Sequence, residues 1–227
     1  MMISFKGAHV AKELMLTCVR WYVTYPASDR QLEERLQERG VLVDHSTIDR
    51  WVLKSSPQLE AAFHRRKRPV WLSWRMDDTD IRRRGHWRDL HRAVDQAGHT
   101  IDCLITAPRD RAAALRFLVE AIRRHGGPDT ITVDGCEANA SAMRGDHKAH
   151  GTTIRIRQVR DRNHGVEQDH RAVKRITHPM WGFKSVEAAR CTLAGIELMH
   201  MLRKGQWTGG AAQSSTAAEQ FCALAAS

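Results

Sequence analysis

Three acidic side chains are spaced so that a folded sheet could bring them together. Asp77 falls in an expected strand, Asp134 directly follows another, and Glu167 falls in the first turn of an expected helix. Carboxylates held close together repel unless a cation binds them, and hard oxygen ligands suit Mg²⁺ or Mn²⁺. Two such ions can activate a water or a 3′-hydroxyl and stabilise the leaving oxygen of a phosphodiester. The trio indicates metal-assisted phosphoryl transfer, although other carboxylates compete for the role: Asp78, Asp80, Asp95 and Glu137.

The charge balance favours a polyanionic partner. The chain of 227 residues has 36 Lys and Arg against 26 Asp and Glu, a net charge of +10. The basic residues gather in runs at 64–68, 82–84, 123–124 and 155–175; each run alone could equally be solvated surface. No basic segment has a strongly apolar second face, and no stretch approaches the roughly 18 apolar residues that cross a bilayer. We therefore expect a cytoplasmic protein that binds nucleic acid and no membrane.

Other catalytic and metal-binding patterns are weak. His147 and His150 lie close in sequence, but no cysteine pair accompanies them, and thirteen histidines make chance proximity common. The sequence has no glycine-rich phosphate loop and no GxSxG motif. Phosphoryl transfer therefore remains the chemistry that the residues favour.

The first sixty residues predict three helices. Apolar spacing predicts the first over 8–24, and Ser28 with Gln31 forms a capping-box pattern for the second, over 29–39. Asp44 or Ser46 can cap a third helix whose inward face carries Ile48 and Val52. Such helices form a helix-turn-helix candidate, with a plain helical bundle as the alternative. The DNA-facing side chains would be His45, Ser46, Thr47, Asp49, Arg50 and Lys54.

The rest of the chain predicts an α/β domain. Strands are expected over 70–81, 87–95, 100–106, 130–133 and 153–157, with helices over 110–124, 137–149, 165–177 and 184–204. Three antiparallel strands followed by alternating helix and strand are the connectivity of an RNase H-like domain with a mixed five-stranded sheet. The expected organisation is an all-α helix-turn-helix domain (1–63), a basic linker (64–69), an RNase H-like domain (70–206) and a flexible C-terminal tail (207–227). Within the tail, Phe221 and Leu224 are apolar and could dock against the folded part of the chain.

Several segments together resemble the IS6-family insertion-sequence transposases, the group that includes IS26. They are Phe5-Lys6-Gly7, Val19-Arg20-Trp21-Tyr22, Leu32-Glu33-Glu34, 43–48, Trp74-Arg75-Met76-Asp77, 90–95, 166–171 and 195–200. The resemblance spans residues 5–206 and implies that Asp77, Asp134 and Glu167 are the DDE catalytic triad with Mg²⁺ or Mn²⁺. It also implies DNA contacts by Lys174 and its neighbour Arg171. The implied activity is 3′-end cleavage at terminal inverted repeats and strand transfer into target DNA, by a bacterial homo-oligomer on DNA associated with the nucleoid.

The chain departs from this family where tyrosine is usual. Those positions hold Asp29, Asp49, Asp80, Asp89, His91 and Asp161, and Gly165 replaces an apolar residue. Asp80 and Asp89 fall on adjacent expected strands, where like charges would loosen the sheet around Asp77. Two alternatives therefore stay open: a catalytically defective or decayed copy that acts only as a DNA-binding protein, and a general RNA–DNA hybrid nuclease.

Overall fold

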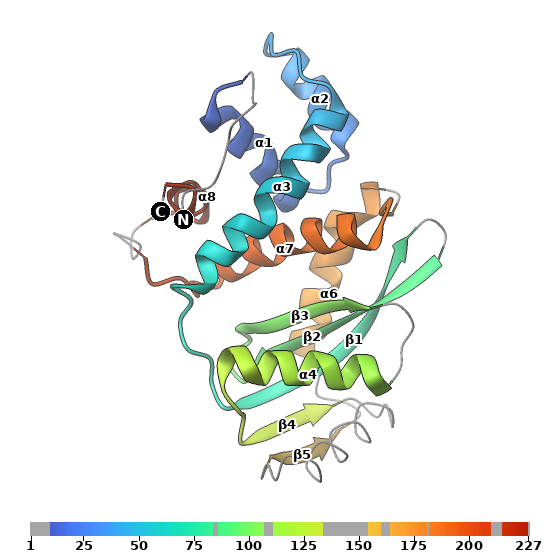
Figure 1. Ribbon diagram of the computed structural model, residues 1–227, viewed down its shortest axis with the longest axis vertical. Helices are drawn as coiled ribbons and strands as arrows, with labels where there is room; N and C mark the ends of the chain where they lie inside the picture. Colours follow the sequence, from blue (N-terminus) through green and yellow to red (C-terminus); the bar gives the residue numbers. More distant parts are fainter. Residues whose placement is uncertain are drawn as a thin grey trace. The chain divides into compact units, whose positions relative to one another are not determined.

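The computed structural model describes residues 10–83, 86–106, 111–133, 154–159, 164–180, 182–209 and 215–226 (Figure 1). Its contacts divide the chain into two compact units. One unit combines residues 1–68 with residues 173–227, and the other consists of residues 69–172. The predicted helix over 137–149 lies outside the described residues, as do Asp134 and Asp161.

The N-terminal helices form where their capping signals place them. They are α1 (Lys12–Thr24), α2 (Asp29–Gln37) and α3 (His45–His64). The Ser28 side chain accepts from the backbone N–H of Gln31, and the Gln31 side chain accepts from the N–H of Ser28, which completes the predicted capping box. Asp44 caps α3, and Ile48 and Val52 on its inner face are fully buried. The three predicted helices are therefore confirmed.

Two C-terminal helices complete this helical unit. The first, α7 (Val186–Arg203), follows the short helix η1 (His178–Met180) and packs against α1 and α3. A Cβ at Gly195 would lie 2.6 Å from Val23 Cγ1 and 2.7 Å from Ser56 Oγ, so this close approach requires glycine. The second, α8 (Ala217–Leu224), buries Phe221 and Leu224. These two apolar side chains are therefore docked as the sequence allowed, within the segment expected to be a flexible tail.

The second unit is built on a five-stranded mixed sheet. Its strands are β1 (Ser73–Arg83), β2 (His86–Asp95), β3 (Thr100–Thr106), β4 (Thr130–Val133) and β5 (Arg155–Gln158). Their order is β3-β2-β1-β4-β5. Strand β2 is antiparallel to both β1 and β3, while β4 and β5 run parallel to β1. This topology is RNase H-like, and the predicted fold class is confirmed.

Strand alternation gives the sheet two different faces. Helix α4 (Arg111–His125) lies across one face (Figure 1) and packs Phe117 and Leu118 onto the apolar side chains there. These side chains are Trp74, Met76, Ala93, Ile101, Ile131 and Val133, with Ile154 and Ile156 at the margin. The residues between them in sequence, including Arg75 and Asp77, must point to the opposite face.

The compact units do not coincide with the expected domain boundaries. Residues 173–206, expected in the RNase H-like domain, are grouped with the N-terminal helices. The basic linker is partly tied to that unit, since the Arg68 N–H donates to the Gln206 carbonyl and the Thr208 N–H donates to the Arg66 carbonyl. The division of the chain into a DNA-binding domain and a catalytic domain stays a prediction. Within the described part of the chain, no helix combines the length and apolar character that a membrane crossing needs.

Candidate active site

Asp77 lies on the face of the sheet opposite α4. It is paired in register with Arg92 of β2, and its Oδ1 accepts the backbone N–H of Asp78 at 2.9 Å. Its side chain keeps 16% of its surface exposed. Asp77 is therefore a carboxylate on the central strand of the sheet, with access to solvent.

Helix α6 (His164–Thr177) brings a second acidic side chain to this region. His170 of α6 is buried, and its Nδ1 lies 3.5 Å from Asp77 Oδ2. Glu167 precedes His170 by one helical turn and is exposed. Residues three apart share a helix face, so the contact between His170 and Asp77 places Glu167 on the side of α6 that meets Asp77.

A buried ion pair fastens α6 to the same face of the sheet. Arg92 is completely buried, and its Nη1 donates to Asp169 Oδ2 at 2.9 Å. A buried guanidinium is costly unless it is paired and hydrogen-bonded. The pair from Arg92 to Asp169 therefore holds α6 against β2, at the residue that pairs with Asp77 in the sheet.

The third predicted carboxylate, Asp134, lies outside the described residues. Val133, which precedes it, is the last residue of β4 and pairs with Met76, the neighbour of Asp77. The assignment of Asp77, Asp134 and Glu167 as a metal-binding triad stays a prediction. The described members fit a hard divalent cation, since both offer carboxylate oxygens that solvent reaches.

The competing carboxylates that are described lie on the α4 face. Asp78 Oδ1 is 2.5 Å from Nδ1 of His91, whose ring stacks on Phe117 and whose Nε2 lies 3.2 Å from Thr106 Oγ1. Asp95 is buried opposite Trp74 and accepts backbone N–H groups of Trp71, Ala97 and His99. Asp80 follows Asp78 by two residues and so shares its face. These carboxylates do not face α6, and Glu137 lies outside the described residues.

The sequence assigned no role to Arg92, Asp169 or His170, although all three lie in segments that resemble the IS6 family, 90–95 and 166–171. A signal for His170 was present, because it follows Glu167 by three residues on a predicted helix and so shares its face. No comparable signal marks Arg92, since an arginine in a strand usually points to solvent.

Helix α3 presents the basic surface that was predicted for it. Arg50 and Lys54 are exposed, on the side away from buried Ile48 and Val52. Arg50 Nη2 donates to Thr47 Oγ1 at 2.8 Å. On α6, Arg171 and Lys174 are also exposed, four and seven residues after Glu167. Whether these side chains touch DNA stays a prediction.

Asp49 faces a pocket within the helical unit. Its Oδ2 lies 3.3 Å from Lys184 Nζ, so the negative charge that it adds to α3 has a cationic partner. The pocket has a volume of about 280 Å³, and Tyr22 and Asp29 also line it. Burial raises the pKa of the Tyr22 phenol, and the charges of Asp29 and Asp49 add to that rise.

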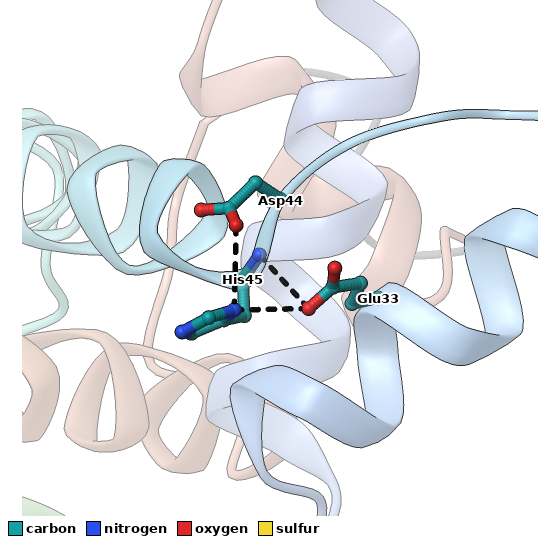
Figure 2. A group of neighbouring side chains, drawn as sticks. All are labelled: Glu33, Asp44 and His45. Atoms are coloured by element: carbon teal, nitrogen blue, oxygen red, sulfur yellow. Dashed lines mark hydrogen bonds and ion pairs between the residues drawn. The ribbon is translucent and has the colours of Figure 1, made fainter.

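The turn between α2 and α3 is closed by side chains at the start of α3 (Figure 2). Glu33 Oε2 of α2 accepts the backbone N–H of His45 at 3.2 Å and lies 3.0 Å from His45 Nδ1. Asp44 Oδ1 accepts the N–H of Ser46 at 2.8 Å, and hydrogen bonds from Ser46 lower the pKa of Asp44. The ligand atoms of Glu33, Asp44 and His45 lie within 4.8 Å of one another, a spacing that could also hold a metal ion. Helix capping accounts for the hydrogen bonds without one.

Comparison with known proteins decides the family. A family model described as a DDE domain, DDE_Tnp_IS240, matches residues 71–206. The transposase of the insertion sequence-like element IS431mec from Staphylococcus aureus is 33% identical over 208 residues, which are 88% of each chain. This chain belongs to the IS6 family of insertion-sequence transposases. The transposase of IS257 in transposon Tn4003, also from Staphylococcus aureus, has the same identity and coverage.

This transposase is also similar to retroviral integrase structures. The catalytic core domain of HTLV-2 integrase in complex with magnesium, in its trimeric form, is 14% identical, with a TM-score of 0.46 over 68% of this chain and 97% of that chain. The family and the sheet topology establish the transposase as an enzyme with a DDE catalytic domain. The resemblance stated from the sequence is thereby confirmed.

Proposed function

We propose that this transposase binds the terminal inverted repeats of its insertion sequence, cleaves their 3′ ends and transfers the strands into target DNA. The observation that carries the proposal is the meeting of β1 and α6 on one face of the sheet. The contact between His170 and Asp77 and the pair from Arg92 to Asp169 bring the Asp77 and Glu167 segments together. Described carboxylates that could compete lie on the other face.

Asp134 supplies the third ligand in this proposal. It is bonded to Val133, and Val133 pairs with Met76 in the parallel register of β1 and β4. This connectivity supports the role, because Asp134 directly follows the β4 residue that pairs with Met76, and Asp77 directly follows Met76 in β1.

The residues of the chain divide the work between them. Asp77, Asp134 and Glu167 would hold Mg²⁺ or Mn²⁺, which when bound supplies charge stabilisation to the reacting phosphodiester. His170 orients the Asp77 carboxylate, and Asp169 keeps the buried guanidinium of Arg92 paired. Arg171 and Lys174, exposed on α6 beyond Glu167, would contact DNA phosphates.

Recognition of the inverted repeats is assigned to α3. His45, Ser46 and Thr47 occupy its first turn, and Arg50 and Lys54 follow on its exposed side. Recognition helices of helix-turn-helix proteins place such N-terminal residues in the major groove. A homo-oligomer would be needed to hold two element ends together.

A duplex that carries the inverted repeat tests this function. The wild-type transposase is expected to shift the duplex and, with Mg²⁺, to nick it at the element end. Asp77→Asn and Glu167→Gln should abolish nicking and leave the shift nearly unchanged, because each removes a metal ligand charge. Glu120→Gln, which removes an exposed carboxylate of α4, is the matched control and should still nick.

The alternatives predict different outcomes of the same assay. A shift without nicking by the wild-type chain would indicate a defective copy that only binds DNA. Cutting without end specificity, together with cleavage of an RNA–DNA hybrid, would indicate a general nuclease. Unaltered nicking by Asp77→Asn would overturn the metal-site assignment.

A further inference from the structure

The face of the sheet that carries Asp77 also carries a row of arginines. Ile154 and Ile156 belong to the apolar cluster beneath α4, so Arg155 and Arg157 of β5 project from the opposite face. On β1, Arg75 lies two residues before Asp77 and shares its face. Arg155 and Arg157 are exposed, and Arg75 is partly exposed.

The register of the parallel strands aligns these arginines. Arg75 pairs with Thr132 of β4, and Thr132 pairs with Arg157 of β5, so the three form one row across the sheet. Neighbouring strands are about 4.8 Å apart, which puts Arg75 and Arg157 about 10 Å apart at the backbone. Arg155 stands on the same side of β5, in the row of Thr130. We call Arg75, Arg155 and Arg157 the arginine strip.

The strip is suited to a polyanion. Among the described residues of β1, β4 and β5, Asp77 is the one acidic side chain on this face, and it stands beside the Arg75 row. Thr132 of β4 pairs with both Arg75 and Arg157, and Thr130 pairs with Arg155. A threonine hydroxyl on this face can donate to a phosphate oxygen. Guanidinium groups bind phosphates through paired hydrogen bonds.

We propose that the arginine strip binds the phosphodiester backbone of the DNA strand that enters the active site. This inference rests on the proposed function and adds a DNA-binding surface distinct from α3. The strip runs from β5, the last strand in the sheet order, to the row beside Asp77. A strand that follows it reaches the carboxylates with its phosphates already neutralised.

The test compares Arg155→Gln/Arg157→Gln with Arg116→Gln/Arg123→Gln, a control that removes two exposed arginines from α4 on the other face. Binding to the inverted-repeat duplex is measured by anisotropy between 50 and 300 mM NaCl. We expect the strip variant to flatten the slope of log Kd against log[NaCl] by about two and to raise Kd at 100 mM NaCl by roughly tenfold or more. The control should match wild type, and Arg155→Lys/Arg157→Lys should recover most of the affinity.

A hydroxyl-radical footprint shows which part of the duplex the strip protects. The strip variant should leave the cleaved end of the duplex open to the radical and keep protection where α3 binds. A slope and footprint equal to wild type, in a variant with unchanged thermal unfolding, would overturn the strip while leaving the proposed function in place. Absence of any shift by the wild-type chain would instead count against the proposed function itself.

Discussion

Arg92 of β2 and Asp169 of α6 form a buried ion pair, with 2.9 Å between Arg92 Nη1 and Asp169 Oδ2. Arg92 stands directly opposite Asp77 in the sheet, and Asp169 lies two residues after Glu167. This ion pair therefore links the two segments that carry proposed metal ligands. Loss of this ion pair should therefore lower both the free energy of unfolding and the rate of nicking.

Removing the charge of Asp169 should destabilise the transposase. Asp169→Asn removes the charge that pairs with the buried Arg92 guanidinium, a change that costs about 3 kcal/mol in comparable pairs. Urea unfolding monitored by tryptophan fluorescence measures the loss. Arg92→Met/Asp169→Leu should recover much of it, because an apolar pair carries no desolvation cost. Equal stability of Asp169→Asn and wild type would show that the pair does not hold α6.

The exposed basic side chains of α3 should contribute to DNA affinity. Arg50→Ala/Lys54→Ala is expected to weaken binding to the inverted repeat and to lower the salt slope by about one for each phosphate that is no longer neutralised. Arg190→Ala/Arg203→Ala removes two exposed arginines from α7 and serves as the control. If both double variants bind alike, α3 is a structural helix and the bundle alternative gains support.

The aspartates in the strands near Asp77 should cost stability. Asp80 and Asp89 are paired in register across β1 and β2, as predicted, with Asp80 exposed and Asp89 buried. A cross-strand aromatic pair contributes about 0.2–1 kcal/mol, and like charges oppose pairing. Asp80→Tyr/Asp89→Tyr should therefore raise Tm by about 2 °C. A fall in Tm would mean that the two carboxylates are better solvated or paired than tyrosines would be packed.

The C-terminal helix should be part of the folded core. Phe221 is completely buried, and its truncation in Phe221→Ala should cost about 3–5 kcal/mol of unfolding free energy. Cys222→Ala changes the exposed neighbour on the same helix and should leave the unfolding midpoint unaltered. Unfolding in guanidinium chloride compares the two variants; a Phe221→Ala protein as stable as wild type would return this segment to the status of a dispensable tail.

Local signals made much of the fold predictable. The capping box of Ser28 and Gln31 marked the start of α2, and the run Thr130–Val133 has the bounds of β4. The partners of α7 and α8 could not be predicted in this way. Helix α7 is buried along most of its length, so its apolar pattern in the sequence indicates no single neighbour. The structure identifies α1 and α3 as neighbours through their close approach to Gly195.

The candidate site shows the same division. Asp77 and Glu167 could be named from residue type and expected topology, whereas the burial of Arg92 depends on a partner 77 residues away. No local pattern distinguishes a paired, buried arginine from a solvated one. Long-range ion pairs of this kind cannot be predicted until the strands and α6 are placed.

The helical unit joins residues 1–68 to residues 173–227, with the whole sheet encoded between them. During synthesis on the ribosome, α1 and α3 therefore emerge long before α7 and α8 exist to cover them. Until α7 and α8 are synthesised, the apolar surface of α1 and α3 that they cover stays exposed. The helical unit, which is proposed to recognise DNA, is therefore the last to be completed. A chain that ends before α7 would lack that cover, so premature termination there yields no fragment with a complete helical unit.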